Sequence, residues 1–365
     1  MVAAALPLPR PVSRRCTRPA MLAGAVTALA MVVAGCGSSA PPVATPLHAA
    51  PEPAVSPAAV ADPPGTVVAL AGSPEGVAVT AGGVVAVNVH HPDGLVVFPL
   101  GSGGAAAARQ FLPLTGSARH LTLAGPDGPA LVPQEDTDHL VEVALPGGAT
   151  VASVPVGRQP HEAFAVSPDE VVVANEFGNS GSVIRAGRVV ATVPAPLQPG
   201  GGASSADGSR FVLVGVRGRR ITEYTADGRV VGSANCGAGP THTVTGDDGL
   251  FWVNDTNGDA VLGFRLTASG PQQVATISTG AGSRPYGDAY DAAHHTLWVT
   301  LTGRDQLLGL SFSGSRVVRR RVIDTVRQPN TVAVDPTTGE VVVTGSLPDG
   351  QLQLLSPALL GAAGG

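Results

Sequence analysis

The stretch PHEAFAVSPDEVVVANEFGNSGSVIRAGRVVATVPAPLQPG, residues 160–200, decides the fold of this chain. It contains four short runs of apolar and β-branched residues, at 163–166, 171–174, 182–184 and 189–193, with turns at 167–169 and 186–187. Runs this short and this rich in valine favour the strands of a half-buried sheet over helices. The stretch therefore predicts one unit of four strands.

The same unit recurs on both sides of this stretch. Each copy begins with a turn, which we call the opening turn, at Pro74, Ala118, Pro160, Pro199, Pro240, Pro285 and Pro329. The spacings are 44, 42, 39, 41, 45 and 44 residues. A period of roughly 40 to 45 residues built from four short strands is typical of β-propeller blades. The sequence therefore predicts an all-β, seven-bladed propeller of four-stranded blades over residues 65–356.

The last copy has only three strands, at 331–334, 341–344 and 351–355, followed by residues 357–365, which we expect to form a flexible tail. A spare strand, TVVAL at 66–70, precedes the first opening turn. We expect this N-terminal strand to lie beside 351–355 and close the ring, because closure removes two exposed sheet edges.

The unit resembles the YVTN-type repeats of β-propellers. The matching residues are Pro160, AVSPD at 165–169, VAN at 173–175, SVI at 182–184 and VATV at 190–193, with weaker copies at 274–277 and 332–336. The tyrosine that begins the family motif is absent, which is a local packing difference. The resemblance spans residues 66–356 and implies fold more than activity. Because members of this family are often exported, it implies a surface-exposed binding or scaffold domain.

The first 64 residues indicate export and a lipid anchor. Four arginines precede an uncharged run at 20–34, which has the length of a signal-peptide apolar region. VAGC at 33–36 resembles a bacterial lipobox, which implies cleavage before Cys36 and lipidation of its thiol. Residues 37–64 contain eight prolines and almost nothing to bury. We expect a signal peptide at 1–35, a lipidated tether at 36–64 and a location on the extracytoplasmic side of the cell membrane. Whether export is by the Sec or Tat route stays open.

Composition excludes several classes of function. The chain has no lysine, and its 22 arginines face 27 acidic residues, for a net charge of −5. An acidic chain without a basic stripe is unsuited to a phosphate backbone, so we expect no nucleic-acid partner. Neither a phosphate-binding loop nor a G-x-S-x-G nucleophile motif is present. Cys236 has no cysteine within the propeller with which to form a disulfide.

Polar side chains gather on one face of the predicted ring. The opening turns and the loops between second and third strands lie on the same face of a propeller, around its channel. Of the eight histidines in the repeats, six fall in these loops and only His294 and His295 do not. We therefore expect ligand binding at this face. The candidate residues at the channel mouth are His120, His161, Glu162, Glu176, His242, Tyr286 and Asn330.

Three of these residues, His120, His161 and His242, hold near-equivalent positions in the second, third and fifth copies. Imidazoles with carboxylates nearby could bind Zn²⁺ or another transition metal. Solvated or hydrogen-bonded loop histidines would give the same pattern. The sequence therefore leaves the identity of any metal or cofactor unknown.

Two classes of function fit these observations. The first is a membrane-anchored extracytoplasmic propeller that acts as a binding or scaffold domain for a protein, glycan or small-molecule ligand. The alternative is a propeller enzyme of lactonase or lyase type, with or without a metal, in which a histidine is the general base. The absence of an assembled catalytic motif favours the first class, and catalytic residues remain unassigned.

Overall fold

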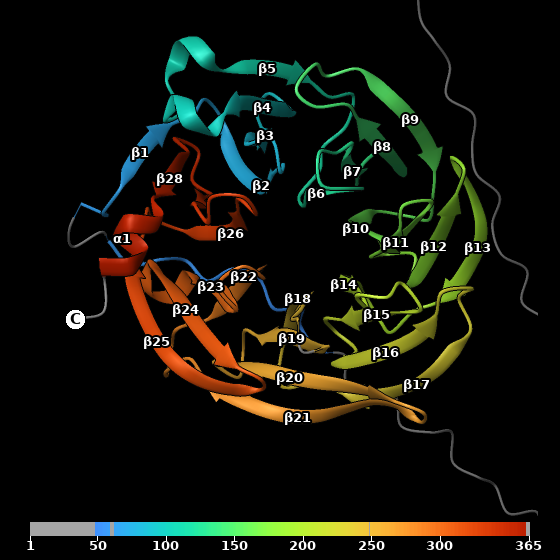
Figure 1. Cartoon of the computed structure of the whole chain (residues 1–365). Helices are drawn as coiled ribbons and strands as arrows, with labels where there is room; N and C mark the ends of the chain where they lie inside the picture. The colour runs from blue at the N-terminus through green and yellow to red at the C-terminus, as the bar shows by residue number, and fades with distance from the viewer. Residues whose placement is uncertain (1–47, 59–61, 248, 363–365) are drawn as a thin grey trace, which may run out of the picture. The chain divides into compact units, whose positions relative to one another are not determined.

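The computed structural model describes residues 48–58, 62–247 and 249–362. Seven antiparallel sheets of four strands each surround a common axis (Figure 1). This arrangement confirms the predicted seven-bladed β-propeller.

Six blades are continuous in sequence. The first comprises β2 (Ser73–Val79), β3 (Val84–His90), β4 (Gly94–Pro99) and β5 (Gln110–Pro113). The second comprises β6 (Thr122–Leu123), β7 (Ala130–Gln134), β8 (His139–Val143) and β9 (Thr150–Pro155). The third comprises β10 (Pro160–Ser167), β11 (Glu170–Asn175), β12 (Ser180–Arg185) and β13 (Arg188–Pro194). The fourth comprises β14 (Pro199–Ser204), β15 (Arg210–Gly215), β16 (Arg220–Thr225) and β17 (Val230–Asn235). The fifth comprises β18 (Pro240–Thr245), β19 (Leu250–Asp255), β20 (Ala260–Thr267) and β21 (Gly270–Ser278). The sixth comprises β22 (Pro285–Asp291), β23 (Thr296–Leu301), β24 (Gln306–Ser313) and β25 (Arg316–Asp324).

The seventh blade joins the two ends of the propeller. Its strands β26 (Pro329–Val334), β27 (Val341–Gly345) and β28 (Gln351–Leu355) are followed in space by β1 (Thr66–Ala69). Strand β1 runs antiparallel to β28, with Thr66 opposite Leu354 and Ala69 opposite Gln351. Figure 1 shows this contact between the blue and red ends of the chain. The predicted closure of the ring is confirmed.

Helical structure is sparse among the described residues. It consists of the short 3₁₀ helices η1 (Leu100–Ser102), η2 (Ala106–Ala108) and η3 (Thr302–Arg304) and the helix α1 (Pro357–Ala362). No helix in the described ranges has the length and apolar content of a membrane span. Helix α1 corrects the expectation of a flexible tail, because Leu360 is buried in a cluster with Trp298 and Ile323.

The core lies between neighbouring blades. Second strands such as β11 and β19 are buried along their whole length, because both faces of these sheets are covered by the adjacent blades. Val212 and Val214 of β15, for example, pack in one cluster with Phe251 and Val253 of β19. Continuous apolar runs in the sequence therefore mark strands that are covered on both faces.

The opening turns distort the innermost strands. In six blades the pairing of the first two strands shifts register directly after the opening proline, for instance between Pro160 and Glu162 and between Pro240 and Thr243. In the second blade Ala118 makes only an isolated bridge, and β6 begins at Thr122. A bulge turns a side chain away from the regular ladder. His161 and His242 lie within two of these register shifts, and His120 lies in the irregular segment of the second blade.

A recurring hydrogen bond links successive blades. The residue before the opening proline donates its backbone N–H to an Asp or Asn that precedes the third strand of the previous blade. The four pairs are Gln159 with Asp138 (2.7 Å), Gln198 with Asn179 (2.7 Å), Arg284 with Asp259 (2.9 Å) and Gln328 with Asp305 (2.9 Å). All four acceptor residues have positive φ, a conformation that Asp and Asn adopt more readily than most residues.

Residues 48–58, which we call the N-terminal strap, contact the propeller. The Ser56 hydroxyl donates to the carbonyl of Thr302 (2.8 Å) and accepts from the N–H of Gln328 (3.0 Å). At the other end of the strap, Arg217 of the fourth blade donates to the carbonyl of His48 (2.8 Å). The expectation of a tether with almost nothing to bury is wrong for this stretch, since Pro51 and Ser56 are buried.

Candidate functional site

Three buried histidines converge at the axis of the propeller, and we call them the His cluster. The ring of His120 lies 4.6 Å from that of His161 and 4.2 Å from that of His242, measured between centroids. The rings of His161 and His242 are 6.2 Å apart. One ring nitrogen from each residue lies within 4.8 Å of the other two. Residues that lie far apart in the sequence therefore present nitrogen atoms to one small volume.

The fourth blade leaves space for this convergence. His161 comes one residue after the opening proline of the third blade, and His242 comes two residues after that of the fifth. The fourth blade has Gly200 and Gly201 at these two positions. A Cβ on Gly201 would lie 2.5 Å from the carbonyl oxygen of Thr241, so the two opening turns pack backbone to backbone. Because no side chain enters from the fourth blade, His161 and His242 approach each other across it.

Carboxylates surround the cluster. The Nδ1 atom of His161 lies 2.7 Å from Oε1 of Glu135 and 3.5 Å from Oε2 of Glu176. The other oxygen of Glu176 accepts a hydrogen bond from Nε2 of Gln198 (2.7 Å). Oε2 of Glu162 lies 3.6 Å from Nδ1 of His242. Glu135 was missing from the candidate set, although the sequence places its loop on this face.

Burial and neighbouring charges set the protonation of the cluster. Burial lowers the pKa of His120 well below its ordinary value, and the charges of His242, His161 and Arg119 lower this pKa further. Burial also lowers the pKa of His161, but the hydrogen bond to Glu135 and the charges of Glu176 and Glu135 outweigh burial and raise it. The contact with His161 lowers the pKa of Glu135 against the effect of burial. Burial therefore favours the neutral form of His120.

Two buried polar atoms at the site lack hydrogen-bond partners among the described residues. They are Nε2 of His120 and Oε2 of Glu162. His120 is 7% exposed and Glu162 is 9% exposed. Because an unpaired buried polar atom is costly, such atoms point to a missing partner.

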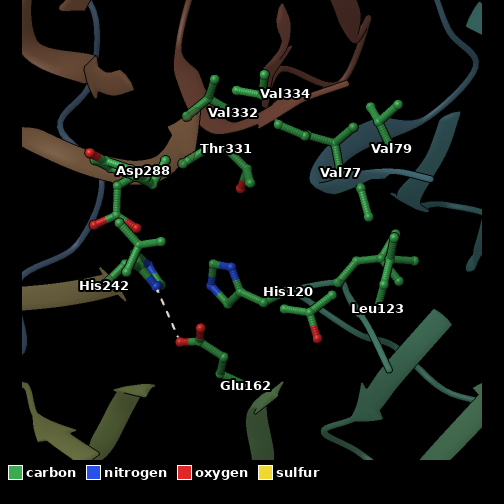
Figure 2. A pocket seen from close by; sticks show the side chains of 18 residues that line it. Val77, Val79, His120, Leu123, Glu162, His242, Asp288, Thr331, Val332 and Val334 are labelled. Atoms are coloured by element: carbon green, nitrogen blue, oxygen red, sulfur yellow. Dashed lines mark ion pairs between the residues drawn. The ribbon is translucent and has the colours of Figure 1, made fainter. Parts of the chain in front are cut away.

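A cavity of about 280 Å³ extends from the cluster along the innermost strands. Its polar end carries His120, His242, Glu162 and Asp288, and Figure 2 shows these side chains around one end of the space. Burial raises the pKa of Asp288 well above its ordinary value, and the charge of Glu162 raises this pKa further. The walls are apolar.

The apolar wall includes Val77, Val79, Leu123, Val332 and Val334 (Figure 2). Val79 and Val334 are the last residues of β2 and β26, so the cavity reaches the ends of the innermost strands that lie opposite the opening turns.

The N-terminal strap covers the other side of the cluster. A second space of only about 20 Å³ is lined by Pro51 and Glu52 of the strap and by His161, His242 and Tyr286 of the propeller. This volume has room for roughly one water molecule. The strap carboxylate of Glu52 lies 3.9 Å from Arg119. The face predicted as the binding surface is thus partly covered at the channel mouth, whereas the longer cavity lies on the other side of the histidines.

The last two candidate residues of the propeller, Tyr286 and Asn330, are both buried. Tyr286 is 3% exposed and packs edge-on against His242 at 4.9 Å, and burial raises the pKa of its phenol. Asn330 is buried, but its side-chain oxygen accepts a hydrogen bond from Thr331 (3.1 Å), and the residue lines neither of the two cavities described above. Cys36 lies outside the described residues.

Comparisons with known proteins identify the fold. No protein-family model matches the chain, and no curated protein matches it. A streptogramin B lyase structure is similar with a TM-score of 0.64 at 12% identity, covering 79% of this chain and 97% of that chain. Virginiamycin B lyase from Staphylococcus aureus has a TM-score of 0.63 at 14% identity, covering 79% and 98%. A chain of the mitotic checkpoint complex has a TM-score of 0.66 at 15% identity, covering 90% and 99%. At such low identity these similarities establish a shared propeller fold.

Proposed function

We propose that this protein is a membrane-anchored extracytoplasmic propeller that binds a small ligand through its histidine-bearing channel. The observation that supports this function is the cavity of about 280 Å³ with a polar end and apolar walls. Small-molecule sites are typically concave and mostly apolar, with a few polar groups that fix the orientation of the ligand. The ligand is thus a small molecule with an apolar body and one polar group.

The polar group of the ligand would meet two carboxyl groups, one that can accept a hydrogen bond and one that can donate a hydrogen bond. Oε2 of Glu162 has no hydrogen-bond partner among the described residues and can accept a hydrogen bond. The raised pKa of Asp288 favours its protonated form, which can donate one. This pair suits a hydroxyl or amide group, which both donates and accepts.

Ligand screening tests this proposal. Thermal shift and native mass spectrometry with a library of small apolar alcohols and amides should identify binders of the wild type. Glu162→Met and Asp288→Leu should each weaken binding about 10-fold or more, because each replaces a polar group that would pair with the ligand by an apolar side chain of similar size. Glu142→Met, on β8 and outside the residues that line the cavity, is the matched control. Binding that is equally strong in all four proteins would place the ligand elsewhere and reject the channel site.

The location on the membrane is a separate part of the proposal. One support is the lipobox-like VAGC at 33–36, which follows an apolar run. A second support is the resemblance of the repeats to those of YVTN-type propellers, which are often exported. Multiple acyl chains hold a protein firmly at a membrane. Cys36→Ala should therefore release the processed protein from the membrane fraction or leave it uncleaved. A processed Cys36→Ala protein that partitions into detergent like the wild type would reject the lipid anchor.

An enzyme of lactonase or lyase type is the second candidate function. It is favoured by the Glu162–His242 pair at 3.6 Å, because a carboxylate beside an imidazole is a common general acid–base arrangement. Assays on panels of lactones, esters and cyclic depsipeptides should then show turnover that His242→Ala reduces at least about 100-fold. This second candidate function is rejected if no substrate is turned over. It is also rejected if the double variant His161→Ala, His242→Ala turns over substrate as fast as the wild type.

A further inference from the structure

We propose that the His cluster is a binding site for a divalent transition-metal ion, with His120, His161 and His242 as its ligands. One nitrogen from each of these buried side chains lies within 4.8 Å of the other two. This inference goes beyond the small-ligand function and does not depend on it.

The donor atoms select the class of metal. Three imidazole nitrogens suit Zn²⁺ and neighbouring first-row ions, whereas Ca²⁺ and Mg²⁺ prefer oxygen ligands. Three histidines also leave one coordination position of a tetrahedral ion free. His120, His242 and Glu162 line the same cavity, which offers space for a fourth ligand. Zn²⁺ is the ion that best matches this set.

The surroundings of His161 match those of a metal ligand. Its Nδ1 atom is hydrogen-bonded to Glu135 at 2.7 Å, which directs the other ring nitrogen, Nε2, away from the carboxylate. Metal-binding histidines commonly donate their second N–H to a carboxylate, which fixes the tautomer and the ring orientation. His242 has a similar neighbour in Glu162, at 3.6 Å from its Nδ1.

If the His cluster served only to fill the channel, the unpaired Nε2 atom of His120 would have no explanation. Its Nε2 atom is buried and has no hydrogen-bond partner among the described residues. A histidine that only lined the channel would be expected to pair this atom. A metal ion supplies the missing partner.

The geometry requires a small adjustment. Metal–nitrogen distances of about 2.1 Å in a tetrahedron place ligand nitrogens roughly 3.4 Å apart. The observed limit of 4.8 Å is wider. We expect rotation of the imidazole rings about their side-chain bonds to close this difference, because His120 and His242 line the cavity and have space to turn.

Local charge favours a cation. Glu135, Glu162 and Glu176 lie around the cluster, and each has a carboxylate oxygen within 3.6 Å of a histidine nitrogen. The opposing charge is that of Arg119, which lies 3.7 Å from Glu75 and 3.9 Å from Glu52. These two acidic residues offset the arginine, so the net charge around the histidines is negative.

Metal titration of the full chain tests the inference. After treatment with a chelator, the protein should bind one Co²⁺ or one Zn²⁺, with Co²⁺ giving the visible absorption of a four-coordinate site. His120→Ala should weaken binding at least about 100-fold, because it removes one of three ligands. His294→Ala, at a turn on the opposite face, is the matched control and should bind as the wild type does. Binding that His120→Ala leaves unchanged, or that His294→Ala abolishes, would overturn the assignment.

A second variant preserves all three ligands and guards against misfolding of His120→Ala. Glu135→Gln keeps an acceptor for His161 but loses the charge, and we expect Zn²⁺ affinity to fall about 10- to 100-fold with an unchanged circular dichroism spectrum. Unchanged affinity in this variant would contradict the proposed support of His161. Repeating the small-ligand titration with and without chelator separates the two proposals: a ligand that binds equally without metal supports the channel function, whatever the outcome for the metal.

Discussion

Gly201 determines how closely the histidines of the third and fifth blades can approach. Its Cα faces the opening turn of the fifth blade, and an added Cβ would lie 2.5 Å from the Thr241 carbonyl oxygen and 3.2 Å from the Cα of His242. Both atoms belong to the backbone, so the clash cannot be relieved by a side-chain rotation. Gly76 and Gly287 make the same contact with the next opening turn, so a residue without a side chain here is needed for the packing of neighbouring blades.

Gly201→Ala should consequently destabilise the protein by about 1 to 3 kcal/mol, the usual cost of overpacking a tight contact. Gly147→Ala is the control, because an added Cβ there meets nothing within 4 Å. Urea unfolding of the two variants measures the difference. Equal unfolding midpoints would show that the blades can separate at no cost and that the close contact does not position His242.

A second residue-scale effect concerns pH and the pair formed by His90 and Glu75. The hydrogen bond to Glu75, at 3.0 Å, raises the pKa of His90 against the opposing effect of burial. A pKa that is higher in the folded than in the unfolded state stabilises the fold below the unfolded value, and this stabilisation is lost as pH rises through the folded value. The pair should therefore contribute more in mild acid than in mild base.

His90→Gln should lower the melting temperature by about 1 to 2 °C more at about pH 5.5 than at about pH 8.5. The effect is small because the pair is partly exposed and screened by solvent. His91→Gln, at the exposed neighbouring residue, controls for loss of a histidine. A melting-temperature difference that grows with pH would give the opposite sign and reject the assignment.

The candidate residues could be predicted from the sequence only where the repeat marks their position. His120, His161 and His242 follow the opening turns, so equivalence between copies brings them together. Glu135 was missed as a member of the set because its role depends on a 2.7 Å contact between two blades. Asn330 shares the repeat position but faces a different partner, Thr331. Position in a repeat predicts the face of a side chain, whereas its partner depends on packing.

At the scale of elements, the sequence predicted the strands, but not the contacts of the strap or the hydrogen bonds that link successive blades. Valine-rich runs and turn residues predicted strands such as β11 and β12 because each is short and apolar. The strap was missed because proline-rich composition reports only a lack of apolar side chains. Its contacts use backbone carbonyls and Ser56, and composition gives no measure of these. The recurring Asp or Asn before third strands is a signal that the sequence did contain and that could have indicated the links between blades.

One buried hydroxyl contributes two of the hydrogen bonds that hold the strap. Ser56 makes two side-chain hydrogen bonds, one to the carbonyl of Thr302 and one from the N–H of Gln328. Ser56→Ala removes both, and at about 1 kcal/mol each the free energy of strap opening should fall by roughly 1 to 2 kcal/mol. Amide exchange of residues 48–58 should then become about 5- to 30-fold faster, as followed by mass spectrometry.

Val55→Ala is the matched control for the strap, because the adjacent Val55 side chain is 88% exposed. It should leave amide exchange of the segment unchanged. If the two variants exchange at the same rate as the wild type, Ser56 does not hold the strap over the channel mouth.

At the scale of the whole molecule, ring closure couples the two ends of the propeller. Thr66 pairs with Leu354, so the contact joins positions 288 apart (354 minus 66). Closing so long a loop carries an entropic cost, which the burial of β1 must offset. Val68 supplies this burial, since it is 3% exposed and packs in a cluster with Phe98 and Leu352. Val67, its neighbour on the strand, is 40% exposed.

Val68→Asp should therefore open the ring, whereas Val67→Asp should not. Placing an unpaired charge at the buried position should cost about 3 to 5 kcal/mol, while the exposed position should cost less than about 1 kcal/mol. Both proteins keep the full chain, so the comparison isolates one face of one strand. Because blades pack on their neighbours all round the ring, the loss should spread to Trp252, which is buried in the fifth blade. With Trp298→Phe in every protein, so that the fluorescence reports Trp252 alone, urea titrations should show the fluorescence midpoint lowered in Val68→Asp together with the midpoint of the circular dichroism signal. Fluorescence that keeps the wild-type midpoint while circular dichroism shifts would show that β1 only frays locally and that closure does not stabilise the ring as a unit.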